Sequence, residues 1–517
     1  MSVTALVRES ESLVEVLDPI VEEISDPYLQ SIADSAWNRL GAFNVHIRDE
    51  GGHAVAAALA RSLIEQAAYW DWALATGVGV GHLDTWAALE YQRLEQLADE
   101  IDDRIWLKWL LPPGTSFQMP AGTSIPSNPH EAVRRLGFGL DEAVLEPLRF
   151  EGLRAAHQIL ELLAHGNLMG AAILAQQPDM QLPDRMTAIA THLAAAGATA
   201  VTLAVADGNA QLGAAHAQFR QVADAASGIH GLPAHSPGAK HRPDRPPHAS
   251  VSPSLRATAE AERMPPAPPE LTQLGMAYLD AAYDLASAVA SDHAWSADPG
   301  TWIPRQSFRF AVSNLVVVRS GLEGDLGKAI LPFAARMLLE DGARWASLLP
   351  DETNAKPSGT LKALVGDATR RRDRIAQRLR SEGVPQRLID DLLGAARAIP
   401  RPESETPPPP GLDDMLQTGY PNSSGVNSAR AMYGVLSQFT HATPISNWHI
   451  RRDKFSSLTA PTYAITLEAT ARGFERIACI TSVLAGISAE TLRAPLVDLR
   501  ARGAEIARLA ALIHQLG

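Results

Sequence analysis

The stretch RSLIEQAAYW, residues 61–70, returns as RMLLEDGARW at residues 336–345, an offset of 275 positions. Five of the ten positions are identical: an arginine, a leucine, a glutamate, an alanine and a tryptophan. A second stretch, RAAHQILELLAHGN at 154–167, aligns with RAMYGVLSQFTHAT at 430–443 at an offset of 276. Similarity at one fixed period indicates a repeated structural unit. The sequence therefore predicts a tandem duplication.

Length and composition favour two helical units. The chain has 517 residues, which is long for one core when domains usually hold about 100 to 200 residues. Alanine and leucine are abundant, whereas the period-two runs of β-branched and aromatic residues that mark strands are scarce. We therefore predict an all-α protein of two tandem-duplicated helical-bundle lobes, residues 1–228 and 270–517. A flexible linker rich in Pro, Ser and His is expected at 229–269.

Cysteine usage and apolar patterning indicate where the protein resides. The single cysteine, Cys479, excludes an internal disulfide and fits a reducing compartment. The N-terminus lacks the basic region and continuous apolar core of a signal peptide. The most apolar window, 186–206, has a charged counterpart in the second lobe that contains Glu468 and Arg472, so a buried helix is expected there. We predict a cytoplasmic protein with no membrane contact.

The charge balance disfavours nucleic acid as a partner. The net charge of −13 opposes attraction to a phosphate backbone. One local exception is a run of six arginines: Arg370, Arg371, Arg372, Arg374, Arg378 and Arg380. On a helix these side chains point around much of the circumference, which favours a solvated face over a nucleic-acid contact.

The first repeated helix carries one ion pair in each lobe. Arg61 and Glu65 lie one helical turn apart on an otherwise apolar face, and Arg336 and Glu340 occupy the matching positions. Burying such charges costs several kcal/mol unless they are paired and hydrogen-bonded. We therefore expect polar partners near both pairs.

The second repeated helix carries a polar stripe in each lobe. The stripes are Arg154, Gln158, Glu161 and His165, and Arg430, Gly434, Ser437 and His441. If each stripe faces the ion pair of its own lobe, each lobe holds two arginines, a glutamate and a histidine. A histidine beside a carboxylate suits general acid or base catalysis near neutrality, and two arginines suit a phosphate or carboxylate ligand. The same set also suits a buried network that only fixes helix register.

These patterns select the candidate site residues. Possible catalytic roles fall to His441, Ser437, Arg336 and Glu340, and possible ligand-binding roles to Arg61, Glu65, Arg154, His165, Arg430 and Tyr433. Lobe two keeps the tyrosine, serine and histidine together, so any activity is expected there. Ser437 and His441 have the spacing of a nucleophile and a base but lack a glycine-flanked elbow.

No metal or cofactor is expected. Ser437 stands where the first lobe has Glu161, which excludes a metal site common to both lobes. The sequence also has no Walker loop, no strand-associated GxGxxG, no HExxH and no CxxC pair.

Two resemblances follow from these motifs. The RxLxE helix with YGVLSQFTH, residues 433–441, resembles an uncharacterised bacterial helical domain family with RxLxE and YxxLSxxxH motifs. That resemblance implies a helical domain, here in duplicate, and no particular reaction. The paired histidine helices are distantly similar to HEPN-type helical ribonucleases, whose RxxxxH site lies between two bundles. In both stripes of this chain, however, the arginine and the histidine are eleven positions apart.

Three hypotheses about function follow. The first is a regulatory or defence-type protein that binds a small anionic ligand or a protein partner at an Arg/Glu/His cluster. The second is a HEPN-like, metal-independent endoribonuclease, with His441 as acid or base and Arg336 or Arg430 stabilising the phosphate. The third is a structural protein in which the clusters are buried networks. We rank ligand binding first, because the net charge and the motif spacing both disfavour RNA.

Overall fold

The computed structural model shows an all-α protein, as predicted. It describes residues 2–48, 51–75, 81–102, 104, 107, 110, 143, 145–150, 152–165, 168–175, 180–206, 209–232, 267–292, 302–324, 330–347, 359–381, 383–394, 399, 408–420, 428–441, 443, 445–446 and 458–516. These residues form seventeen α-helices and one short 3-10 helix, and they contain no β-strand.

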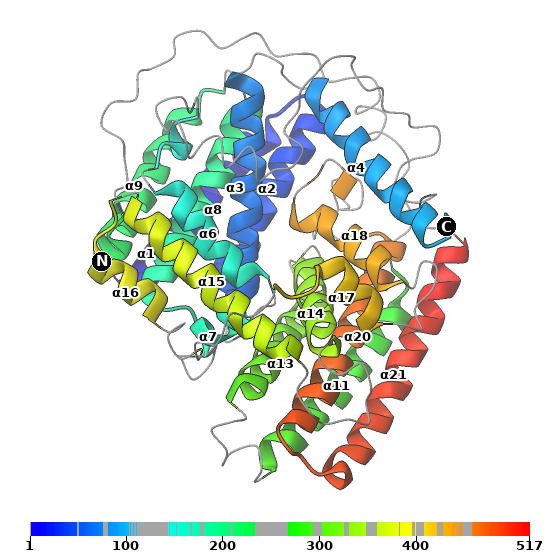
Figure 1. The fold of residues 1–517 in the computed structure, drawn as a ribbon. Helices are drawn as coiled ribbons and strands as arrows, with labels where there is room; N and C mark the ends of the chain where they lie inside the picture. Colours follow the sequence, from blue (N-terminus) through cyan, green and yellow to red (C-terminus); the bar gives the residue numbers. More distant parts are fainter. Residues whose placement is uncertain are drawn as a thin grey trace.

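The first half of the chain forms a bundle around two buried helices (Figure 1). Its main helices are α1 Val3–Glu22, α2 Pro27–His46, α3 His53–Ala75, α6 Leu153–Ala164, α8 Asp184–Val205 and α9 Leu212–His230. α3 and α8 pack along each other, and nearly all their side chains are buried. In the described part of the chain, α8 alone has the length and composition to cross a membrane, and its apolar window lies wholly inside the protein.

The second half repeats these packing relationships. Its main helices are α11 Pro269–Ser291, α13 Trp302–Glu323, α14 Leu331–Ala346, α18 Ala429–Thr440, α20 Ala460–Leu484 and α21 Ala489–Leu516. α14 packs along α20 as α3 packs along α8, and α11 packs along α21 as α1 packs along α9. α18 lies on α14 as α6 lies on α3.

In each half a glycine permits the close crossing of the two central helices, α3 with α8 and α14 with α20. A Cβ atom added to Gly197 of α8 would lie 2.6 Å from the carbonyl carbon of Leu63. A Cβ atom added to Gly473 of α20 would lie 2.5 Å from the carbonyl oxygen of Leu338. Both distances are below the separation that real Cβ atoms show, so only glycine permits these two helices to approach so closely. The glycines are 276 positions apart and the leucines 275, the offsets of the repeated stretches.

Two long helices are exchanged between the halves. α4, Gly81–Glu100, follows α3 in the chain but packs against α18 of the second half. α15, Gly359–Ser381, follows α14 but packs against α6 and α7, Leu168–Leu174, of the first half. Figure 1 shows α15 lying across the first-half bundle and α4 beside α18. Each half therefore contributes one helix to the surface of the other.

The remaining described helices complete the surface. They are η3 Glu146–Leu148, α16 Gln386–Leu393 and α17 Leu412–Gly419. The buried apolar side chains of both halves belong to one continuous cluster. The two halves share this core because α3 packs directly on α13, α14 and α18 of the second half.

The predicted linker lies mostly outside the described residues, at 233–266. Its predicted ends shift slightly. α9 continues to His230, two positions beyond the expected end of the first lobe, and α11 begins at Pro269, one position before the expected start of the second.

The glycine crossing gives a stability prediction. Replacing Gly473 by alanine should lower the free energy of unfolding by roughly 1–3 kcal/mol, because the new methyl group must displace the α14 backbone. The control is Gly41→Ala in α2, where an added Cβ has nothing within 4 Å. There the higher helix propensity of alanine should raise stability by up to about 1 kcal/mol. Urea unfolding measures both; an unchanged unfolding free energy for Gly473→Ala would contradict the close crossing.

Candidate functional site

Glu65, in the middle of α3, joins the two halves. Its carboxylate is fully buried and accepts a hydrogen bond from Nε of Arg61 at 2.9 Å. Nε2 of His157 lies 3.2 Å from the same carboxylate oxygen, Oε1. The other oxygen, Oε2, is 2.9 Å from Nδ1 of His441, which comes from the second half of the chain. A first-half carboxylate thus binds the second-half histidine.

Glu340 makes the reciprocal connection. It pairs with Arg344 on its own helix at 2.5 Å, and both of its oxygens lie 3.2 Å from Nδ1 of His165, a first-half residue. Nη1 of Arg61 lies 2.7 Å from the other ring nitrogen, Nε2, of His165. The expectation that each histidine faces the glutamate of its own lobe is therefore wrong. His165 and His441 each follow the last residue of a helix that ends where the two halves meet, which we call the seam. Each histidine therefore reaches the opposite half.

Arg336 has partners in its own half instead. Its Nη2 donates to the Tyr433 hydroxyl at 2.8 Å, and its Nη1 donates to the Thr440 hydroxyl. The Arg336 guanidinium carbon also lies 5.0 Å from the centre of the Tyr433 ring, the geometry of a cation–π contact. Tyr433 therefore positions a buried arginine.

Three predicted site residues lie away from Glu65 and Glu340 or form a hydrogen bond with another group. Arg430 is at the far end of α18 and pairs with Asp413 at 2.7 Å and Glu100 at 2.5 Å. Arg154 is near the start of α6, about three turns from His165. The Ser437 hydroxyl donates to the backbone oxygen of Tyr433 at 2.7 Å. The expected clusters of two arginines per lobe are therefore wrong, because an eleven-residue spacing places the arginine at the opposite end of the helix.

Burial keeps both seam histidines neutral. It lowers the pKa of His165 to about 4 and that of His441 to about 3, although the facing carboxylates act in the opposite direction. A neutral imidazole beside a carboxylate donates from Nδ1, which leaves Nε2 of His165 to accept from Arg61. These lowered pKa values disfavour the expectation that the two histidines titrate near neutrality. The side chains of His165 and His441 are only 15% and 19% exposed. The ribonuclease hypothesis stays a prediction.

The carboxylates of α14 behave in opposite ways. Burial alone would raise the pKa of Glu340, but Arg344 and His165 lower it well below its ordinary value. Burial raises the pKa of the adjacent Asp341 to about 7. Asp341 is therefore protonated in the folded protein over a range where the unfolded chain ionises it. The stability that this residue contributes is lost as the pH rises from about 4 to 7.

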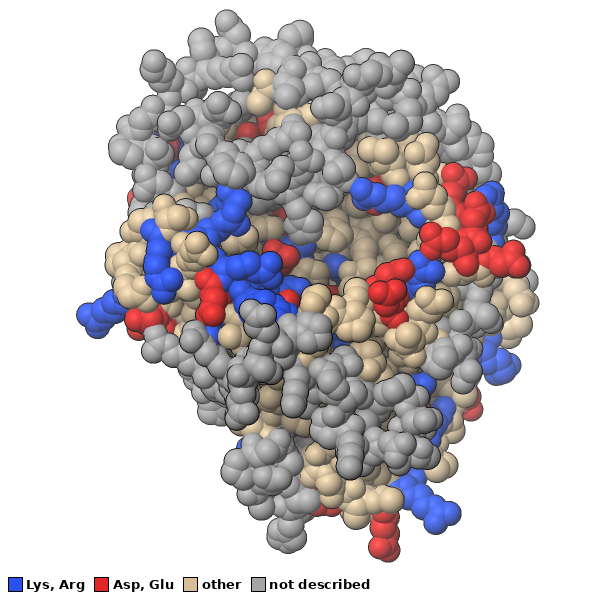
Figure 2. Space-filling model, in the orientation of Figure 1, with Lys and Arg blue, Asp and Glu red and all other residues tan. Residues whose placement is uncertain are grey.

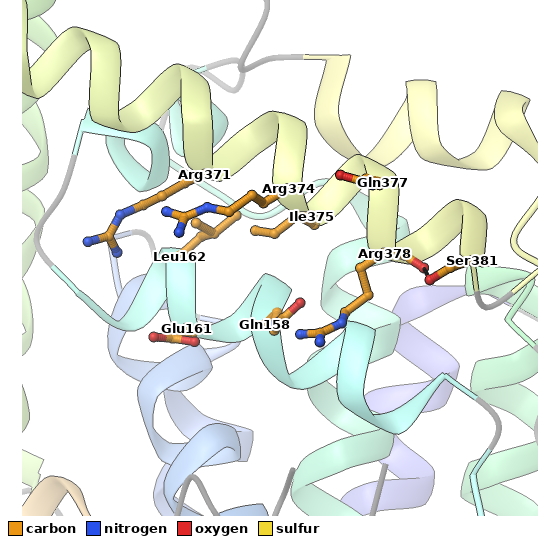
Figure 3. Close-up of a pocket in the computed structure, with 9 residues that line it drawn as sticks. All are labelled: Gln158, Glu161, Leu162, Arg371, Arg374, Ile375, Gln377, Arg378 and Ser381. Carbon is orange, nitrogen blue, oxygen red and sulfur yellow. Dashed lines mark hydrogen bonds between the residues drawn. The ribbon is translucent and has the colours of Figure 1, made fainter. Parts of the chain in front are cut away.

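A polar cleft lies where α15 crosses α6 (Figure 3). Its volume is about 640 Å³. The α15 wall carries Arg371, Arg374 and Arg378, the α6 wall carries Gln158 and Glu161, and Leu162 and Ile375 lie between them. Figure 3 shows Arg378 extending toward Gln158 and Arg374 lying beside Leu162. The exchanged helix thus brings second-half arginines to a first-half stripe.

The cleft arginines differ in whether they already have a partner within the protein. Arg371 pairs with Asp367 on its own helix at 2.7 Å. Arg374 is exposed and has no hydrogen-bond or ion-pair partner among the described residues. The interpretation of the arginine run as a solvated face missed this cleft. Positions 371, 374 and 378 share one helix face, which was the available signal, but the sequence does not reveal which helix lies opposite.

At the matching crossing in the second half, α4 packs closely on α18. Gly434 of α18 stands at the position equivalent to Gln158. A Cβ atom at Gly434 would lie 3.0 Å from a methyl carbon of Leu97 and 3.3 Å from one of Leu94, both on α4. Glycine therefore lets α4 pack closely, and the ion pair between Arg430 and Glu100 reinforces the contact.

The surface charge follows the same asymmetry. In Figure 2 basic side chains gather over α15 on one side of a central hollow, and acidic side chains gather near the end of α4 and over α17. The whole chain carries a net charge of −13, so the α15 arginines form a local basic surface on an acidic protein. Such a surface attracts anions to one place.

No protein-family model, curated protein or solved structure matches this chain. The resemblances given above therefore stay predictions. Among the described residues, no group of three or more His, Cys, Asp or Glu side chains is arranged to hold a metal ion.

Buried neutral histidines give a pH prediction. The pKa values of His46, His53, His165 and His230 are lowered to about 4 and that of His441 to about 3, in each case mainly by burial. The unfolded chain binds these protons near pH 6.5, so stability should fall as the pH drops from about 6.5 to 4. Each histidine contributes at most about 1.4 kcal/mol per pH unit there.

Asp341 and Glu468, whose pKa values burial raises, oppose this trend, but they are two groups against five histidines. Urea unfolding at a series of pH values measures the net effect, and imidazole ¹⁵N shifts report the protonation state of each ring. Stability that stays constant or rises between pH 6.5 and 4 would contradict this description of the buried histidines.

Proposed function

We propose that this protein binds a small anionic molecule in the cleft between α6 and α15. The observation that carries the proposal is Arg374, an arginine without an acidic partner in the described structure, in a cleft that Arg371 and Arg378 also line. Guanidinium groups bind phosphates and carboxylates through paired hydrogen bonds. A volume of about 640 Å³ lies within the range of small-molecule sites.

The Arg/Glu/His network has a different role in this proposal. Its carboxylates and guanidinium groups already bind one another and the two seam histidines, so they hold the halves together. The ligand site therefore moves from the predicted cluster to the neighbouring cleft. Glu161, which lines the cleft, and His165, which belongs to the network, are one turn apart on α6. A ligand there bridges helices of both halves, which suits a regulatory role.

We also infer that the two halves arose by tandem duplication. The matching glycine crossings, the matching helix pairs and the reciprocal helix exchange support this origin. The halves have since diverged at the exchanged helices. Gln158 and the α15 arginines accompany an open cleft, whereas Gly434 and the leucines of α4 accompany a closely packed crossing.

Arg374→Ala tests the binding proposal. Calorimetry with inorganic pyrophosphate should show binding to the wild-type protein and a loss of about tenfold or more in affinity for the variant, because a charged hydrogen-bonding partner is removed. The matched control is Arg380→Ala, which removes the same charge from the same helix but lies outside the cleft lining, where Arg380 donates to Gln386 at 2.8 Å.

Arg380→Ala should bind pyrophosphate as the wild type does. Saturating pyrophosphate should also stabilise the wild type, by about 2.7 kcal/mol at a hundred times its Kd. Equal pyrophosphate affinity in the wild type and in both variants would overturn the proposal, and so would a wild-type protein that binds neither pyrophosphate nor a phosphorylated sugar.

A further inference from the structure

The two walls of the α6–α15 cleft offer different chemistry. The α15 wall presents guanidinium groups, which only donate hydrogen bonds and carry positive charge. The α6 wall presents the carboxylate of Glu161, which only accepts, and the amide of Gln158, which does both. A ligand that satisfies both walls needs anionic groups on one side and hydrogen-bond donors, such as hydroxyls, on the other.

We propose that the ligand is a sugar that carries more than one phosphate, an assignment that rests on the proposed function above. The phosphates bind the α15 arginines, and the sugar hydroxyls donate to Glu161 and Gln158. The face of the sugar ring that presents C–H groups packs on the apolar patch that Leu162 and Ile375 form between the walls.

The length of the arginine row indicates more than one phosphate. Arg371 and Arg378 are seven positions apart on one helix face, a rise of about 10 Å. In Figure 3 the Arg378 side chain extends toward α6, whereas those of Arg371 and Arg374 extend along α15 in another direction, so the three guanidinium groups do not meet at one point and suit more than one phosphate. The volume of about 640 Å³ also leaves room for a sugar beside the phosphates.

The lining of the cleft disfavours a nucleotide. Proteins commonly recognise unpaired bases by stacking them on aromatic side chains. None of the described residues that line the cleft is aromatic. Its apolar part is limited to two aliphatic side chains, which suit a sugar ring.

Glu161 sets the orientation of the ligand. A carboxylate has about four acceptor positions, so it can bind hydroxyl groups in addition to its contacts within the protein. Its negative charge repels phosphates, which therefore lie against α15. Glu161 thus acts as a specificity residue, whereas Arg374 contributes to the binding of any phosphate.

Calorimetry on the full-length protein tests this assignment. The ligands are fructose bisphosphate, inorganic pyrophosphate and ADP, and the variants are Glu161→Gln and Arg374→Ala. Fructose bisphosphate should bind the wild type at least about tenfold more tightly than pyrophosphate or ADP, because only it offers hydroxyls together with separated phosphates.

The two variants should distinguish the contributions of the two walls to binding. Glu161→Gln should weaken fructose bisphosphate by about tenfold and leave pyrophosphate unchanged or tighter, since a repulsive charge is lost. Arg374→Ala should weaken both. Arg374-dependent binding in which pyrophosphate or ADP equals or exceeds fructose bisphosphate would overturn the sugar assignment and keep the proposed function. Absence of Arg374-dependent binding for all three ligands would overturn both.

Discussion

Two buried carboxylates, Glu65 and Glu340, each bind a histidine from the opposite half of the chain. Leaving a carboxylate buried without such partners would cost several kcal/mol, so the network forms only when both halves are in place. Arg61 strengthens the connection because it binds Glu65 and also the histidine that reaches Glu340. The seam is thus a polar centre inside a largely apolar core.

The exchanged helices depend on this arrangement. With α3 packed against α14 at the seam, α15 crosses the first-half bundle and α4 crosses the second. Both crossings pair an exchanged helix with a helix of the second repeated stretch, but their residues differ. Gly434 lets the leucines of α4 pack closely at one crossing, while the other keeps about 640 Å³ between Gln158 and the α15 arginines. We place the ligand site at the open crossing, which differs from the half in which activity was expected.

The sequence predicted the helical class and the residues of the network better than their pairing. An arginine and a glutamate one turn apart on an apolar helix indicate burial, and Arg61, Glu65, Arg336 and Glu340 are all buried. Repeated segments share the same local sequence, so a within-half and a crossed arrangement give the same pattern. Only the tertiary packing decides between them. The cleft was missed for a related reason, since nothing in the arginine run identifies α6 as its neighbour.

The central claim is that Glu65 and His441 hold the halves together by direct pairing. A double-mutant cycle of Glu65→Gln and His441→Ala, followed by urea unfolding at pH 7, measures it most directly. We predict single variants that each lower stability and a coupling energy of about 1–3 kcal/mol, as for residues in contact. A coupling energy below about 0.5 kcal/mol, the value for distant and independent sites, would contradict the reciprocal pairing of the two halves.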